Sequence, residues 1–151
     1  GYEALLETPV VENLLWLSDA CAEHGVTLAM ENSPTACDSP EALLAYVKQL
    51  GHSNIRPMVD TTEACEAGRD PVAFVSKAEP CHLHLSDFAG NQKHLPAGEG
   101  GIDWQGLRRV LADQAYAGMY TLEPSYKFYL DHIDEKLARA YEFIARLMDG
   151  E

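Results

Sequence analysis

Residues 81–87 read Cys81-His82-Leu83-His84-Leu85-Ser86-Asp87, and this stretch carries the strongest indication of the fold. The run Cys81–Leu85 is rich in strand-forming residues and predicts a short strand. Side chains two apart on a strand share a face, so His82 and His84 point to one side and the two leucines to the other. We expect Leu83 and Leu85 to face surrounding helices. His84 then lies at the carboxyl end of the strand, with His82 one layer deeper.

Three further apolar runs predict strands, namely Val26–Met30, Ile55–Val59 and Met119–Leu122. Around them the apolar residues recur with a period of about 3.6, which predicts five helices. Helix-start signals stand at Ser39-Pro40, at Asp70-Pro71 and at Asp103. Nothing in the pattern marks a linker or repeat, so we expect a single domain over residues 1–151.

Strands that alternate with helices predict an α/β fold with a parallel sheet and right-handed crossovers. Two architectures fit four such units, a small doubly wound sheet or part of a (β/α)8 TIM barrel. A complete barrel typically needs about 250 residues, so a barrel of this chain's length is a half-barrel.

Composition excludes several classes of protein. The chain has 151 residues, 46% of them hydrophobic, with 11 Lys+Arg against 24 Asp+Glu and a net charge of −13. No apolar run approaches the roughly 18 residues of a membrane helix, and no basic patch is present to bind nucleic acid phosphates. Four cysteines without CxxC spacing predict buried free thiols and a cytoplasmic location; they are Cys21, Cys37, Cys65 and Cys81.

A potential ligand side chain stands at the end of each predicted strand: Glu31, Asp60, His84 and Glu123, with spacings of 29, 24 and 39 residues. The carboxyl ends of parallel strands lie on one rim, so these side chains are expected to converge. Three carboxylates and an imidazole at one place repel one another unless a cation lies among them. An oxygen-rich set with one nitrogen suits Mn²⁺ or Mg²⁺, with Zn²⁺ or Co²⁺ as alternatives.

In these residues the chain resembles the xylose isomerase-like TIM barrels, a superfamily of sugar isomerases and epimerases, dehydratases and endonuclease IV. The segments that carry the resemblance are Glu31-Asn32, Asp60-Thr61, the His-x-His-x-x-Asp motif at 82–87, the loop 94–104 with its Gly-Glu-Gly turn, and Leu122-Glu123. The resemblance spans essentially the whole chain but only strands five to eight of the family's barrel, with its N-terminal half absent.

The resemblance implies a divalent-metal-dependent isomerase or epimerase acting on a sugar, sugar phosphate or keto-polyol by proton transfer through a metal-stabilised enediolate. Glu31, Asp60, His84 and Glu123 then hold one metal ion, and Glu31 and Glu123 also act as base and acid. Expected substrate contacts are Glu63, His82, His94 and Glu99. For His82 a hydrogen-bonded core histidine is the competing interpretation, and for the turn around Glu99 a purely structural one.

Two departures oppose an endonuclease. Glu63 stands where the family usually has His, and Gln92 stands where endonuclease IV has Asp, so a trinuclear zinc site loses ligands. A dehydratase of the same superfamily and a non-catalytic half-barrel remain alternatives. Because a half-barrel leaves Val26–Met30 and Met119–Leu122 as unpaired edges, we also expect a homo-oligomer or completion by a missing N-terminal half.

Overall fold

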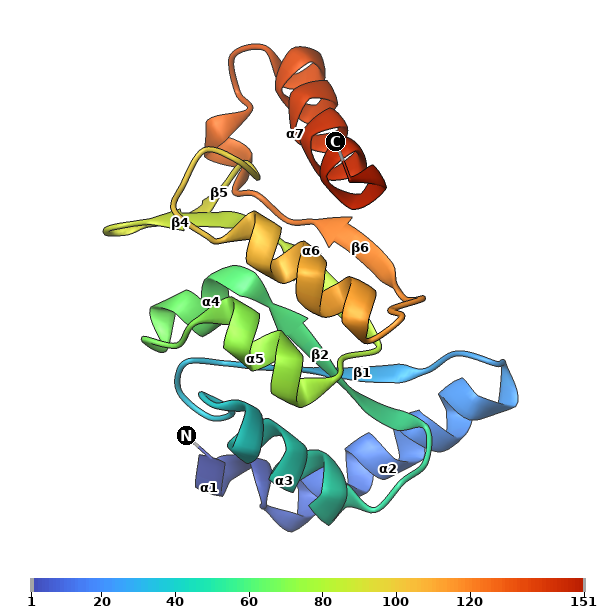
Figure 1. The fold of residues 1–151 in the computed structure, drawn as a ribbon. Helices are drawn as coiled ribbons and strands as arrows, with labels where there is room; N and C mark the ends of the chain where they lie inside the picture. The colour runs from blue at the N-terminus through green and yellow to red at the C-terminus, as the bar shows by residue number, and fades with distance from the viewer. Residues whose placement is uncertain (1, 151) are drawn as a thin grey trace.

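Four parallel strands form the central sheet (Figure 1): β1 (Leu28–Glu31), β2 (Ile55–Asp60), β3 (His82–Leu85) and β6 (Met119–Leu122). The structure is a computed structural model, and it describes residues 2–150. Gly1 and Glu151, the two ends of the predicted domain, therefore lie outside the described residues. The strands are neighbours in chain order, β1-β2-β3-β6, and every pairing is parallel. A doubly wound sheet requires a reversal of strand order. The described sheet has none, so the half-barrel is the correct alternative.

The five predicted helices are present: α2 (Thr8–Glu23), α3 (Pro40–Leu50), α5 (Pro71–Ala78), α6 (Trp104–Asp113) and α7 (Ile133–Asp149). Helices α3, α5 and α6 lie side by side along one face of the sheet, as Figure 1 shows. The start signals act as predicted, because a side-chain oxygen at each N-cap accepts a backbone N–H of the first turn. Ser39 accepts from Ala42, Asp70 from Val72 and Ala73, and Asp103 from Gly106.

The two faces of the sheet differ in burial. Leu83 and Leu85 are fully buried and belong to the core with Leu43, Phe74 and Leu107, which come from α3, α5 and α6. His82 and His84 alternate with these leucines and are only half-buried. The predicted division of β3 into a helix-facing leucine side and an opposite histidine side is therefore confirmed.

Some elements were not predicted. These are the short helices α1 (Tyr2–Leu5) and α4 (Thr61–Glu66), the 3-10 turn η1 (Tyr126–Phe128) and the antiparallel hairpin of β4 (Asp87–Ala89) and β5 (Gln92–Leu95). The predicted strand Val26–Met30 also begins later, at Leu28. The backbone N–H of Val26 donates to Cys21 at 2.9 Å and so closes the end of α2 instead of joining the sheet.

The cysteine prediction is confirmed in part. All four thiols are free, but only Cys37 is buried and the other three are half-buried. Among the helices of residues 2–150, none combines the length and apolar character needed to cross a membrane.

Candidate metal centre

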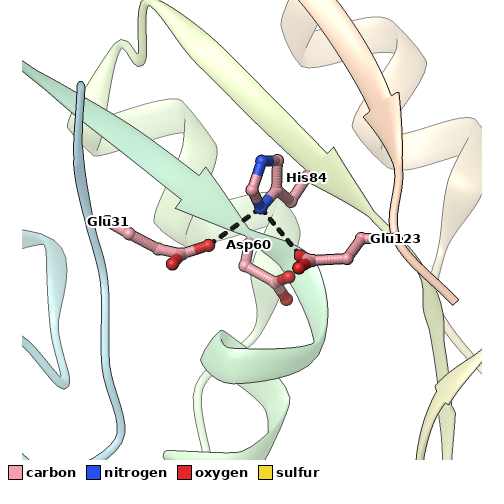
Figure 2. Close-up of side chains that lie close together, drawn as sticks. All are labelled: Glu31, Asp60, His84 and Glu123. Atoms are coloured by element: carbon pink, nitrogen blue, oxygen red, sulfur yellow. Dashed lines mark ion pairs between the residues drawn. The ribbon is translucent and has the colours of Figure 1, made fainter. Parts of the chain in front are cut away.

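The four side chains at the strand ends point toward one another, as Figure 2 shows. Glu31 and Asp60 are the last residues of β1 and β2, His84 lies in β3, and Glu123 directly follows β6. Each offers one ligand atom, and these atoms all lie within 4.8 Å of one another. His84 Nδ1 lies 3.0 Å from Glu31 Oε1 and 2.7 Å from Glu123 Oε2. The convergence predicted from the sequence is confirmed.

Two buried polar atoms of this cluster lack hydrogen bonds. Asp60 uses Oδ1 to accept the Glu63 backbone N–H at 2.9 Å, which caps α4, while its buried Oδ2 has no partner. His84 Nδ1 is likewise buried and without a hydrogen bond, although it lies within ion-pair distance of the two glutamates. Buried polar atoms normally find partners. A divalent cation at the centre of the four side chains would coordinate both atoms, so the residues fit a metal ion.

Burial disfavours the ionised form of the carboxylates in the cluster. The pKa of Asp60 is raised to about 8, chiefly by burial and also by the neighbouring carboxylates of Glu123 and Glu31, against the opposing α4 backbone hydrogen bond. Burial also raises the pKa of Glu31, with a contribution from Glu123, although His84 opposes the shift. A bound cation reverses this balance, because it stabilises the ionised carboxylates.

Asn32 positions the centre, a role that sequence reasoning missed. Its side chain is buried and accepts the Asp60 backbone N–H at 2.7 Å through Oδ1. Its Nδ2 donates to the Asp60 carbonyl at 3.1 Å. This pair of bonds joins the end of β1 to the end of β2, beside the carboxylates of Glu31 and Asp60. The signal in the sequence that could have indicated this role is the position of Asn32 directly after Glu31, in the Glu31-Asn32 segment that carries the family resemblance.

His82 makes a hydrogen bond inside the sheet. Its Nε2 lies 2.9 Å from Thr121 Oγ1 on β6, and its ring meets that of His84 edge-on with centroids 5.3 Å apart. Burial, with a smaller effect of His84, lowers the pKa of His82. These contacts match the interpretation as a hydrogen-bonded histidine, and its substrate role stays a prediction.

Two of the expected substrate contacts lie beside the cluster. His94 Nδ1 is 3.1 Å from the Glu123 carbonyl oxygen, and its Nε2 is 3.5 Å from Glu63 Oε1. Glu63 is close because its own N–H binds Asp60. The structure therefore brings Glu63 and His94 to the edge of the four-residue site.

Glu99 lies elsewhere. It is exposed and lines a hollow of about 570 Å³ between the loop 96–99 and α7, and none of the four cluster residues lines that hollow. Glu99 was expected at the site because it is close to His94 in the sequence. In the structure the loop turns, and Glu99 lies toward α7. Its predicted substrate contact has no support from this placement.

Asp87, the last residue of the histidine motif, organises this loop, and its role was also missed. Its fully buried carboxylate accepts the backbone N–H groups of Gly98 and Ile102 and the indole N–H of Trp104, at 3.0, 3.1 and 2.8 Å. A Cβ at Gly100 would collide with this carboxylate, so the Gly-Glu-Gly turn has a structural reason. Trp104 is itself buried in the core.

The comparisons with known proteins agree with this geometry. The model of the family described as xylose isomerase-like TIM barrel matches residues 2–147. No curated protein matches the sequence. At identities below 25%, a likeness to solved structures shows the fold alone.

Solved structures with this fold include a D-tagatose 3-epimerase-like protein, 21% identical with a TM-score of 0.76 over 93% of this chain and 53% of that chain. A D-psicose 3-epimerase from Clostridium cellulolyticum H10 is 19% identical, with a TM-score of 0.74 over 92% of this chain and 55% of its own. The probable 3-DHS dehydratase of Bacillus anthracis is 17% identical, with a TM-score of 0.71 over 89% of this chain and 55% of that chain.

The present chain spans about half the length of these solved structures. Its four-stranded parallel sheet is correspondingly a partial barrel, with the candidate metal ligands at the carboxyl ends of all four strands. By its sequence match over residues 2–147 and by its fold, the chain belongs to the xylose isomerase-like TIM barrel family.

Proposed function

We propose that this chain supplies strands five to eight of a divalent-metal-dependent sugar or sugar phosphate isomerase or epimerase. The observation that supports this most is the convergence of Glu31, Asp60, His84 and Glu123 within 4.8 Å, with two buried ligand atoms left without hydrogen bonds. Family membership and similar structures described as sugar epimerases add support.

Asp60 and His84 hold the metal ion together with the two glutamates, and the oxygen-rich set favours Mn²⁺ or Mg²⁺. When bound, such an ion polarises the hydroxyl and carbonyl oxygens of a sugar and stabilises developing negative charge. His84 presents Nδ1 between the two glutamates, and Asp60 is held by both Asn32 and α4.

Glu31 and Glu123 are the proton-transfer groups of the proposal. Their side chains are 41% and 47% exposed, against 21% for His84, so they are the members most accessible to a ligand on the open face of the sheet. Either carboxylate can take a proton from a substrate carbon, and the other can return one. Glu63 and His94 are the flanking groups for substrate hydroxyls, with His82 below them.

The proposal is tested with the full 151-residue chain. Mn²⁺ binding is measured by calorimetry, and ketoses with and without phosphate are then incubated in D₂O to follow deuterium incorporation by NMR. Glu123→Gln keeps an oxygen for weak ligation but removes the base, so exchange is expected to fall by about 10²–10⁴-fold. Glu41→Gln is the matched control, because Glu41 is exposed and pairs with Lys77 on the helical side.

A chain that binds no Mn²⁺ contradicts the metal centre, and exchange at the unaltered rate in Glu123→Gln contradicts the two-glutamate mechanism. The dehydratase alternative has a similar structure described as a probable 3-DHS dehydratase. Loss of water from a keto-polyol in the same set of incubations would identify the dehydratase. Binding of metal and sugar without either reaction indicates the non-catalytic half-barrel.

A further inference from the structure

His94 has an unusual backbone conformation. It lies in β5 with φ of +53°, a left-handed value that side-chain-bearing residues rarely adopt. Such a conformation persists only where surrounding contacts maintain it, and these contacts often belong to functional sites. The contacts of His94 lead directly to Glu123.

His94 holds the segment after β6 at two points. Its ring Nδ1 lies 3.1 Å from the carbonyl oxygen of Glu123, and its own carbonyl accepts the backbone N–H of Ser125 at 2.8 Å. Between these two points stands Pro124, which has no N–H to donate. In its left-handed conformation, His94 thus contacts the same short segment with both its ring and its carbonyl.

The proton on the ring follows from the partners. A carbonyl oxygen can only accept, so the hydrogen bond between His94 Nδ1 and the Glu123 carbonyl requires a proton on Nδ1. Ser86 Oγ, at 3.2 Å from Nδ1, accepts a share of the same proton. Ser86 can then donate to Thr62 Oγ1 at 2.8 Å, and Thr62 donates to the Asp87 carbonyl at 3.2 Å. This ordered chain of hydrogen bonds anchors the ring in buried structure.

The hairpin of β4 and β5 that carries His94 is itself fixed to α4. Lys93 Nζ pairs with Glu66 at 2.8 Å, and His94 Nε2 faces Glu63 at 3.5 Å, both on α4. The N-terminus of α4 is capped by Asp60. The hairpin thus connects the segment of one candidate ligand, Glu123, to the helix that begins at another.

Glu123 has need of such support. Strand β6 lies at the edge of the sheet and pairs only with β3 among the described strands. Glu123 follows its last residue, and its N–H makes the final bond to the sheet, to Leu85 at 3.0 Å. The other three ligands lie within strands of the sheet, so Glu123 is the one whose backbone depends on contacts beyond the ladder.

We propose that His94 is a positioning residue for Glu123: through Nδ1–H it fixes the Glu123 carbonyl and thereby directs the carboxylate into the cluster. The inference rests on the proposed function in taking Glu123 as a metal ligand. His94 itself is not a ligand in this arrangement, because its Nδ1 is occupied by the carbonyl and its Nε2 faces Glu63.

The first test compares Mn²⁺ affinity among three variants of the full chain. His94→Gly accepts the positive φ and removes the ring. His94→Asn also tolerates this φ, and its amide nitrogen can occupy the place of Nδ1. Removal of a partner that orients a ligand typically lowers metal affinity 10–100-fold, so His94→Gly is expected to lose about that factor while His94→Asn keeps most of the affinity. Lys77→Gln, the same substitution at an exposed lysine that pairs with Glu41 on the helical side of the sheet, is the control and is expected to leave affinity unchanged.

A double-mutant cycle then identifies the route. If His94 acts through Glu123, His94→Gly has much less effect in the Glu123→Gln background than in the unaltered chain. Equal loss in both backgrounds, unaltered affinity in His94→Gly, or equal loss in His94→Asn and His94→Gly each overturn the inference.

A metal-independent measurement separates this inference from the proposed function. Imidazole ¹⁵N NMR of the metal-free chain should show a proton on His94 Nδ1, and the Glu123 carbonyl ¹³C resonance should move in His94→Gly but not in Lys77→Gln. An unprotonated Nδ1, or an unmoved carbonyl resonance, overturns the positioning role whether or not the chain binds Mn²⁺. Absence of Mn²⁺ binding with these NMR results intact contradicts the proposed function and leaves the positioning of Glu123 by His94 standing.

Discussion

Asp60 shows at the scale of one residue how the fold prepares a candidate metal ligand. Its carboxylate is fully buried, one oxygen caps α4 and the other has no hydrogen-bond partner. The backbone of the same residue is held on both sides by the Asn32 amide. The position of this carboxylate is therefore rigid while its charge is poorly compensated, which is the state that a cation relieves.

The stability of the metal-free chain should fall as pH rises. The pKa of Asp60 is about 8 in the folded chain against an ordinary value of 3.8, so between these pH values the folded chain holds a proton that the unfolded chain has released. The free energy of unfolding then decreases with rising pH across this window, because the folded state binds more protons. Mn²⁺ replaces that proton and should raise the melting temperature more at about pH 8 than at about pH 5.

Calorimetric melting with and without Mn²⁺ checks this prediction. Asp60→Asn keeps the cap oxygen and removes the titrating group, so it is expected to lose both this part of the pH dependence and most of the Mn²⁺ effect. Equal stabilisation by Mn²⁺ at the two pH values would contradict the prediction.

Glu63 belongs to the edge of the site rather than to the ligand set. Its carboxylate faces His94 Nε2 at 3.5 Å and its backbone, not its side chain, contacts Asp60. We expect Glu63→Ala to raise KM for the sugar with little change in kcat, because it removes a contact common to the ground state and the transition state. Glu41→Ala, at an exposed glutamate that pairs with Lys77 on the helical side, is the control. A fall in kcat with unchanged KM would instead make Glu63 a proton-transfer group.

At the scale of elements, the segments between the strands do much of the positioning. The β4–β5 hairpin carries His94 to the segment after β6, and the loop that follows is gathered around the carboxylate of Asp87. Helix α4 begins on Asp60 and supplies Glu63 and the Thr62 hydroxyl to the same region. The open side of the site is thus built from short elements that pack on one another.

Removal of the Asp87 carboxylate should destabilise the chain strongly. Asp87→Ala leaves the indole N–H of Trp104 and the backbone N–H groups of Gly98 and Ile102 without their acceptor. Each unsatisfied buried donor costs about 1–3 kcal/mol, so a loss of about 3 kcal/mol or more in the free energy of unfolding is expected. Asp87→Asn keeps one acceptor oxygen and should lose less.

Urea unfolding measures these differences. The control is Asp113→Asn at the exposed end of α6, for which a change within about 0.5 kcal/mol is expected. A loss for Asp87→Ala as small as that of the control would show that the loop does not depend on this carboxylate.

At the scale of the whole molecule, the partial barrel leaves apolar surface at both edges of its sheet. Helix α7, beyond β6, exposes Ile133, Leu137 and Tyr141 at successive four-residue steps, and the Tyr141 side chain is 69% exposed. On the side of β1, Trp16 of α2 is 70% exposed. Contiguous exposed apolar side chains usually mark an interaction surface.

We expect the chain to associate into a dimer or larger species that buries these edges. An interface that completes the barrel should bury upward of about 2,000 Å². Light scattering at tens of micromolar measures the mass, and Leu137→Glu is expected to shift the population toward monomer. Ala138→Glu adds the same charge at an adjacent exposed position of α7 and is the control. A monomer that unfolds cooperatively would show that the four-stranded sheet is stable alone.

The sequence by itself determined the features that depend on local pattern. The period-two alternation in β3 predicted Leu83 in the core and His84 on the opposite face. Ser39 marked the start of α3, because its side chain accepts the backbone N–H of Ala42 three residues further along the chain. The parallel arrangement followed from alternating elements, and a parallel arrangement brings strand ends together whatever the sequence between them. The four candidate ligands could therefore be found without coordinates.

Only the tertiary structure decided the contacts that join distant parts of the chain. Asn32 reaches Asp60 across 28 residues, and His94 reaches the Glu123 carbonyl across 29. Such bonds depend on how a loop closes in space, and no local periodicity encodes that closure. The same reason explains Glu99, which is five residues from His94 in the chain but faces α7. Residue type and spacing determined which groups could bind a metal, whereas long-range hydrogen bonds decided how firmly each is held and which neighbours lie at the site.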